Sequence, residues 1–283
     1  MNRRGRAALA LLAALVAAGC GGEERRGGRG GGPTTKAGAS TPTAAAADHA
    51  AAPALDPAAA APSAHLFDRV AVLGASVSAG LAAPPVATSI KAGLPADAAV
   101  LDVASVLFFQ DPFANGRAQV DAALAHRPTV VVALDFLFWF AYADASPAER
   151  RARLDAGLAL LAPLPGTLLV GDLPDMRNAN PRVLGPAAVP SPDELAALDD
   201  QIRRWAAARP HTLVLPLAAW TAPLVTGADI ELAPGERVPA RDLMFFDGLH
   251  ANALGTWHLL DLVDHTLERE LAVPADALRL VRP

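Results

Sequence analysis

With 283 residues, a formal net charge of -5 and a mean hydropathy of +0.28, the chain is long enough for one large domain or two small ones. Its acidic balance and lack of a basic run in the apolar part argue against nucleic acid as a partner. The only cysteine is Cys20, so neither disulfides nor a thiol nucleophile are available to anything folded after it.

The first twenty residues follow the plan of a secretory signal. Three arginines precede an apolar run over residues 7–18, which is too short for a membrane span. Residues 16–20, Val-Ala-Ala-Gly-Cys, resemble the lipobox of bacterial lipoproteins, although Ala17 stands where that pattern usually has Leu. The resemblance implies a signal peptide over 1–20, lipidation of Cys20, and an exported domain anchored to the membrane of the bacterial envelope, as in the periplasm. An ordinary cleaved signal with an incidental cysteine is the alternative.

The composition changes twice along the chain. Residues 21–63 are dominated by Gly, Ala, Pro and Thr, and Leu55 is their only large apolar side chain. Such a segment cannot bury enough surface to offset its chain entropy, so we expect a disordered tether. Residues 64–283 are rich in Val, Leu, Ala and Phe and predict one folded domain. Without residues 1–62, which carry seven basic and four acidic side chains, the formal charge becomes -8.

Strand and helix patterns alternate through this domain. Short apolar runs bounded by turn residues predict buried strands over 69–74, 99–104, 129–134, 167–171 and 212–217. Apolar residues at three-to-four spacing predict helices over 117–125, 147–161, 192–208 and 251–271, two of which begin with a Ser-Pro pair. The alternation indicates a parallel sheet covered on both faces, with its ligand site beyond the carboxyl ends of the strands.

The first predicted strand leads into a turn of small residues. Residues 74–80 read Gly-Ala-Ser-Val-Ser-Ala-Gly. A serine hydroxyl is a poor nucleophile unless a base takes its proton, and a tight turn after a strand exposes it for that purpose. Ser76 is therefore a candidate nucleophile, and a plain strand-to-helix turn is the alternative.

A second pattern lies just before or at the start of the last predicted helix. Residues 245–255 read Phe-Phe-Asp-Gly-Leu-His-Ala-Asn-Ala-Leu-Gly. A carboxylate three residues before a histidine, in a turn, can accept from one imidazole nitrogen and leave the other facing a serine. Asp247 and His250 are therefore candidates for an acid-base pair, and a capped helix start is the alternative.

Together these patterns resemble the SGNH/GDSL hydrolase family over residues 66–271. The resemblance implies a flavodoxin-like, three-layer α/β/α sandwich with a five-stranded parallel sheet. It also implies that Ser76 is the nucleophile, Asp247 the carboxylate and His250 the base of a serine esterase that works through an acyl-enzyme. We expect no cofactor and no metal, since the sequence has no metal-ligand cluster or Gly-rich phosphate loop.

The oxyanion hole of that family is where this sequence departs from the pattern. The resemblance implies a backbone donor after the second strand, for which Gly116 is the only glycine between residues 106 and 128, beside the N–H of Ser76. The family also has Gly-x-Asn after the third strand, and residues 133–138 read Ala-Leu-Asp-Phe-Leu-Phe. One register sets Asp135 and Leu137 on that Gly and Asn, another sets Ala133 and Asp135 there, and neither offers an amide.

Two residues near this gap have open roles. Asn115, beside Gly116, is a hypothetical substitute donor of an amide N–H. Asp135 at a strand's end would repel an oxyanion when ionised, and only a protonated carboxyl could donate to one; pairing with an arginine and binding of a substrate group are the alternatives. Aromatic residues after the second and third strands either wall an acyl or aryl pocket or pack in the core: Phe108, Phe109, Phe113, Phe136, Phe138, Trp139 and Phe140.

The preferred function is hydrolysis of a carboxylic ester, from a small molecule or from the cell envelope, by a monomer. A binding protein that keeps the fold with a degraded site is one alternative, favoured by the missing amide. Acyl transfer to an envelope glycan is another. The identity of the ester lies beyond the sequence, because the fold serves many substrates.

Overall fold

The computed structural model describes residues 65–275 and 277–283. The expected signal peptide, the tether and Cys20 lie outside the described residues. The strands are β1 (Arg69–Val72), β2 (Ala99–Asp102), β3 (Val130–Ala133), β4 (Thr167–Gly171), β5 (Thr212–Leu215), β6 (Asp229–Ala233) and β7 (Glu236–Pro239). The helices are α2 (Val86–Gly93), α3 (Pro112–His126), α4 (Phe138–Ala141), α5 (Pro147–Leu161), α6 (Pro192–Ala207), α7 (Leu217–Thr226) and α8 (Ala253–Leu271), with short 3₁₀ turns η3 (Phe108–Gln110), η4 (Pro186–Ala188) and η5 (Ala240–Leu243). None of the described helices is long and apolar enough to cross a membrane.

The main sheet has five parallel strands in the order β2-β1-β3-β4-β5. In the register, Val72 of β1 pairs with Asp102 of β2 on one side and with Val132 of β3 on the other. This order is that of flavodoxin-like folds. The expected fold class and all five expected strands are confirmed. Four of the strands end earlier than expected. The residues that follow them leave the sheet at the carboxyl ends of the strands, which is where the site lies.

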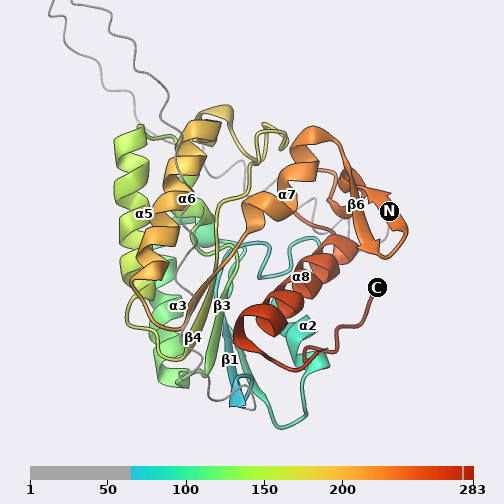
Figure 1. The fold of residues 1–283 in the computed structure, drawn as a ribbon. Helices are drawn as coiled ribbons and strands as arrows, with labels where there is room; N and C mark the ends of the chain where they lie inside the picture. Colours follow the sequence, from blue (N-terminus) through green and yellow to red (C-terminus); the bar gives the residue numbers. More distant parts are fainter. Residues whose placement is uncertain (1–64, 276) are drawn as a thin grey trace, which may run out of the picture.

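Each face of the sheet is covered by helices, as Figure 1 shows. Along β1 and the residue that follows it, alternate side chains point to opposite faces, so Ala71 and Leu73 join one buried cluster and Val70 and Val72 the other. The first cluster includes residues of α3, α5 and α6, and the second includes residues of α2 and α8. Burial on both faces explains why the strands read as continuous apolar runs.

The helix starts follow the expected chemistry. Ser146 and Ser191 cap α5 and α6, and in both helices a glutamate at the third position closes a capping box, with proline in the first turn. α3 begins five residues before the expected start at 117, because Asp111 caps it by accepting a hydrogen bond from Ala114 N–H at 3.0 Å. The caps therefore set the residue at which each of these helices begins.

Some elements were not expected from the sequence. The run that predicted a strand to residue 217 ends at Leu215, and α7 begins after Pro216. An antiparallel hairpin of β6 and β7 then precedes the turn that leads to α8. α2 and the four-residue α4 are also additional. Of these, α7 and α4 matter for function, because both contribute to the pocket described below.

Candidate active site

Ser76 and Asp135 lie where the sheet changes its winding direction. β1 and β3 are neighbours in the sheet, and the chain leaves β1 toward β2 but leaves β3 toward β4 on the other side. The turn after β1 carries Ser76, and Asp135 follows β3 by two residues. In open α/β sheets ligands bind in the crevice beyond the strand ends at such a point.

The turn that carries Ser76 is fixed at its first residue. Gly74 has φ +147°, and a Cβ there would lie 2.1 Å from Asp135 Oδ1. The buried side chain of Gln119, from α3, holds both sides of this residue: its Oε1 accepts from Gly74 N–H at 2.8 Å and its Nε2 donates to Gly74 O at 2.9 Å. Only glycine allows this conformation and the close approach of the Asp135 carboxylate.

Asp135 holds the rest of the turn. Its Oδ1 accepts from Ala75 N–H at 2.9 Å and from the Ser78 hydroxyl at 2.6 Å. Its Oδ2 accepts from Val77 N–H at 2.8 Å and from Ser78 N–H at 3.3 Å. Each oxygen thus has two donors from the turn, which is the acceptor-only use that suits a carboxylate. The contacts of Asp135 hold the nucleophile turn in place, and among the described residues it has no arginine partner, whereas the substrate-binding role left open by the sequence stays a prediction.

The second pattern forms a tight turn before α8. Asp247 Oδ1 accepts from the backbone N–H groups of Leu249 and His250 at 2.9 and 3.0 Å. Gly248 makes the turn possible with φ +65°, and the backbone O of Asp247 accepts from Asn180 N–H at 2.8 Å. The carboxylate is therefore held by the same backbone that carries the histidine.

Ser76, His250 and Asp247 form one chain of hydrogen bonds. His250 Nε2 lies 2.8 Å from Ser76 Oγ, and His250 Nδ1 lies 2.7 Å from Asp247 Oδ2. Both His250 and Asp247 are buried. Burial alone would raise the pKa of Asp247, but the hydrogen bond and charge of His250 and the two backbone donors hold that pKa below its ordinary value. An ionised Asp247 orients the imidazole so that Nε2 can accept the proton of Ser76.

The N–H of Ser76 is free to bind an oxyanion. Its neighbours Ala75 and Val77 donate to Asp135, whereas no acceptor for Ser76 N–H lies among the residues that the structure describes. A backbone donor next to the nucleophile is the arrangement that stabilises a tetrahedral intermediate.

The structure does not bring Gly116 to the pocket. This residue lies inside α3, and a Cβ on it would meet Phe136 and Leu160 at 3.1 Å. Close packing against α3 explains why residue 116 is a glycine. The structure does not support the oxyanion role expected for Gly116. Asn115 is also absent from the pocket lining, since its amide points to the carbonyls of Leu107 and Phe108 at 3.3 and 3.4 Å. Leu137, at the other position considered for an amide, is buried in the core.

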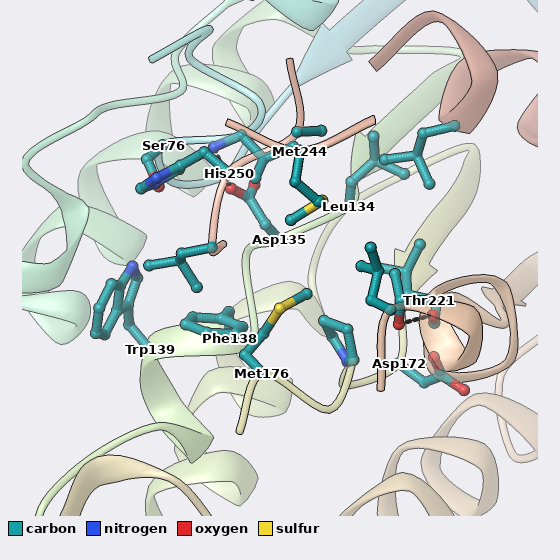
Figure 2. A pocket seen from close by; sticks show the side chains of 17 residues that line it. Ser76, Leu134, Asp135, Phe138, Trp139, Asp172, Met176, Thr221, Met244 and His250 are labelled. Carbon is teal, nitrogen blue, oxygen red and sulfur yellow. Dashed lines mark hydrogen bonds between the residues drawn. The ribbon is translucent and has the colours of Figure 1, made fainter. Parts of the chain in front are cut away.

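A pocket opens beside Ser76 and His250 (Figure 2). The aromatic residues considered for its wall do not all line it. Phe138 and Trp139 line the pocket. The fully buried residues are Phe108, Phe136 and Phe140, which stack and pack edge-to-face with one another. The expectation of an aromatic wall therefore holds for Phe138 and Trp139 of the α4 segment, whereas the half-buried Phe109 packs against Trp139 and the exposed Phe113 packs against Phe140.

Other lining residues were not expected from the sequence. Leu217, Thr221 and Leu224 come from α7, which was not expected as a helix. Their spacing of four and three residues is the available signal, since it sets all three on one helix face. Asp172 also lines the pocket directly after β4, at the strand end where functional residues were sought.

Among the described residues, no cluster of three or more His, Cys, Asp or Glu side chains is placed to hold a metal ion. The candidate chemistry rests on the hydrogen-bonded side chains of Ser76, His250 and Asp247.

Comparison with known proteins gives likenesses of overall structure. No protein-family model and no curated protein matches the sequence. Among solved structures, TesA is 19% identical, with 72% of this chain and 99% of that chain covered at a TM-score of 0.47. The acetylxylan esterase Axe2 from Geobacillus stearothermophilus is 12% identical, with coverages of 72% and 94% and a TM-score of 0.46. The psychrotrophic esterase EstA from Pseudoalteromonas sp. is 14% identical, with coverages of 72% and 99% and a TM-score of 0.41. At these identities and TM-scores the likenesses carry no inference about chemistry.

Proposed function

We propose that this chain is a serine hydrolase of the SGNH/GDSL kind that cleaves carboxylic esters through an acyl-enzyme. The observation that carries the proposal is the unbroken chain from Ser76 Oγ to His250 Nε2 at 2.8 Å and from His250 Nδ1 to Asp247 at 2.7 Å. A site that only binds a ligand makes no demand for these three groups in this order.

In the first half-reaction Ser76 Oγ attacks the ester carbonyl carbon, and His250 Nε2 takes the hydroxyl proton. The carbonyl oxygen becomes an oxyanion, to which Ser76 N–H donates. His250 then gives the proton to the alcohol oxygen, the carbon–oxygen bond of the ester breaks, and the acyl group stays on Ser76. Asp247 stabilises the imidazolium that exists between the two proton transfers.

In the second half-reaction water replaces the alcohol. His250 takes a proton from water as its oxygen attacks the acyl carbon, and then returns a proton to Ser76 Oγ as the carboxylic acid leaves. The absence of a third-strand amide predicts a slow enzyme, because one oxyanion donor is typically worth ~100 to 1000-fold in rate.

Turnover of short-chain aryl esters by the wild type and by Ser76→Ala tests the proposal. We expect the variant to lose at least about 1000-fold in kcat, since removing the nucleophile leaves only binding and the oxyanion donor. A fluorophosphonate probe should label the wild type and not the variant. The proposal would be contradicted by equal hydrolysis by both proteins. It would also be contradicted by a wild type that neither hydrolyses the esters nor is labelled by the probe.

The missing amide favours a second candidate, an SGNH-fold binding protein with a weakened site. Absence of labelling together with retained ligand binding is its expected signature. Acyl transfer to an envelope glycan is distinguished by adding an alcohol acceptor, because a transferase yields the new ester in place of the free acid.

We further propose that the domain is exported and anchored by a lipid on Cys20, as the similarity to a lipobox implies. The support is the sequence of residues 1–20 alone. Wild type expressed in a bacterial host should incorporate labelled palmitate and sediment with membranes, and Cys20→Ser should do neither. A wild type recovered wholly in the soluble periplasmic fraction would contradict the lipid anchor.

A further inference from the structure

The pocket beside Ser76 is lined almost entirely by hydrocarbon. Its side chains include Leu134, Phe138, Met176, Leu217, Leu224 and Met244. They come from both the strand ends and the surrounding helices, so the apolar surface wraps around the pocket. Surface of this kind binds a ligand by removing apolar area from water.

The polar side chains of the pocket, apart from Ser76, His250 and the Trp139 indole, are already engaged within the protein. Both oxygens of Asp135 accept from the nucleophile turn. The Thr221 hydroxyl donates to Leu217 O at 2.7 Å, inside its own helix. Asp172 accepts from Ala218 N–H at 2.7 Å and from Arg203 at 3.1 Å. A sugar ring carries several hydroxyl groups that need partners when buried, and this wall has few to offer.

The pocket runs away from the catalytic serine and has a far wall. In Figure 2 Ser76 and His250 lie on one side, Asp172 and Thr221 lie on the opposite side, and Leu134 and Met176 lie between them. Leu217 and Leu224 of α7 also line the pocket, and Thr221 of α7 and the buried carboxyl of Asp172 lie at that far side. An alkyl chain attached at Ser76 would meet these residues at its end.

We infer that this pocket takes the acyl group of the ester, and that the substrates are esters of medium-chain fatty acids and not acetylated glycans. The inference rests on the proposed function, since it assigns the acyl side of the same site. Each methylene that the apolar wall buries contributes ~0.8 kcal/mol, which corresponds to a rise of about fourfold in kcat/KM. The far wall at α7 and Asp172 stops the gain when the chain reaches it.

Kinetics on a series of aryl esters tests this inference. Wild type should hydrolyse the octanoyl ester with a kcat/KM at least about tenfold above that for the acetyl ester, because several more methylenes are buried. The palmitoyl ester should fall below the octanoyl ester. A wild type that prefers acetyl, or whose rate keeps rising to palmitoyl, overturns the assignment while leaving the hydrolase function intact.

A substitution on α7 tests whether the acyl chain occupies this pocket. Leu224→Trp enlarges a half-buried side chain of α7, so the octanoyl-to-acetyl ratio of kcat/KM should fall about tenfold. Val281→Trp is the matched control, because Val281 is exposed on the C-terminal segment and lies outside this pocket, and its ratio should equal that of wild type. An unchanged ratio in a folded Leu224→Trp overturns the placement of the chain.

Binding of octanoate separates this inference from the proposed function. Titration calorimetry on Ser76→Ala should show octanoate bound at least about tenfold more tightly than acetate, with affinity lost in the double variant carrying Leu224→Trp. Octanoate binding without any ester turnover by wild type would support the pocket and refute the hydrolase. Turnover that depends on Ser76 without a preference for octanoate would refute the pocket alone.

Discussion

The two ends of the pocket hold buried carboxylates in opposite ways. At the catalytic end Asp135 accepts four hydrogen bonds, and Asp247 accepts two from the backbone and one from His250. Beside Asp172 but outside the pocket lining, Asp199 is only 4% exposed and accepts one backbone hydrogen bond, from Leu173 N–H at 2.9 Å. Its neighbour Asp172 carries a second carboxyl, and Arg203 is 4.0 Å from the nearest oxygen of Asp199.

The pKa values of Asp247 and Asp199 are shifted in opposite directions. Several donors offset the cost of burying the charge on Asp247, so its pKa lies below the ordinary value. Burial, with the repulsion of Asp172, raises the pKa of Asp199 to about 7, although the Leu173 N–H and Arg203 oppose the shift. Asp247 therefore stays ionised beside His250, whereas Asp199 binds a proton near neutrality.

Of Asp135 and Asp199, Asp135 should give the larger effect when it is removed, because it holds the nucleophile turn. Asp135→Ala leaves three backbone N–H groups of the nucleophile turn without their acceptor, and the turn should shift. A displacement of about 1 Å at the reacting atoms can cost ~100-fold, so we expect kcat for ester hydrolysis to fall about 100-fold with little change in KM. Steady-state kinetics and the rate of fluorophosphonate labelling both measure this loss.

Ser78→Ala is the matched control for Asp135→Ala. It removes the hydroxyl bond to Asp135 and leaves all three backbone bonds in place, so kcat should stay within about threefold of wild type. Circular dichroism should show that Asp135→Ala remains folded under the assay conditions. A folded Asp135→Ala with wild-type kcat would show that the turn keeps its geometry without the carboxylate.

The fold could be predicted from sequence because its signals are local and repeated. Apolar runs such as 130–133 are buried on both faces of the sheet, and the Ser-Pro starts of α5 and α6 carry their own caps. α7 and the hairpin that follows it could not be predicted in the same way. The run from 212 to 217 is continuously apolar, and only the proline at 216 signals that the strand ends there.

The site was predictable where a motif places its residues within one turn. Asp247 and His250 are three residues apart, and the link to Ser76 follows from the topology of a parallel sheet. The roles of Asp135 and Gly116 depend instead on which residues meet across the fold. Spacing alone cannot show that Asp135 faces the turn after β1, or that Gly116 is needed by packing against Phe136.

A smaller effect, on stability alone, is expected at Asp199, beside the far end of the pocket. The pKa of Asp199 is about 7 when folded and near 3.8 in an unfolded chain, so between these values the unfolded state releases a proton that the folded state keeps. The contribution of Asp199 to the free energy of unfolding therefore falls as pH rises through this window and levels off above it. From about pH 5 to about pH 8 the loss should be on the order of 2 kcal/mol.

Asp199→Asn removes this titration and keeps an oxygen that can accept from Leu173 N–H. Urea unfolding across that range should show a smaller loss of stability in Asp199→Asn than in wild type, by roughly the same 2 kcal/mol. Asp144→Asn, at an exposed position, should follow the wild-type curve. Because Asp199 touches neither Ser76 nor His250, kcat at neutral pH should change by less than about twofold. If Asp199→Asn kept the full pH dependence of stability, Asp199 would not be the group that takes up the proton. The difference in the number of hydrogen-bond donors would then not explain the contrast between Asp199 and Asp247.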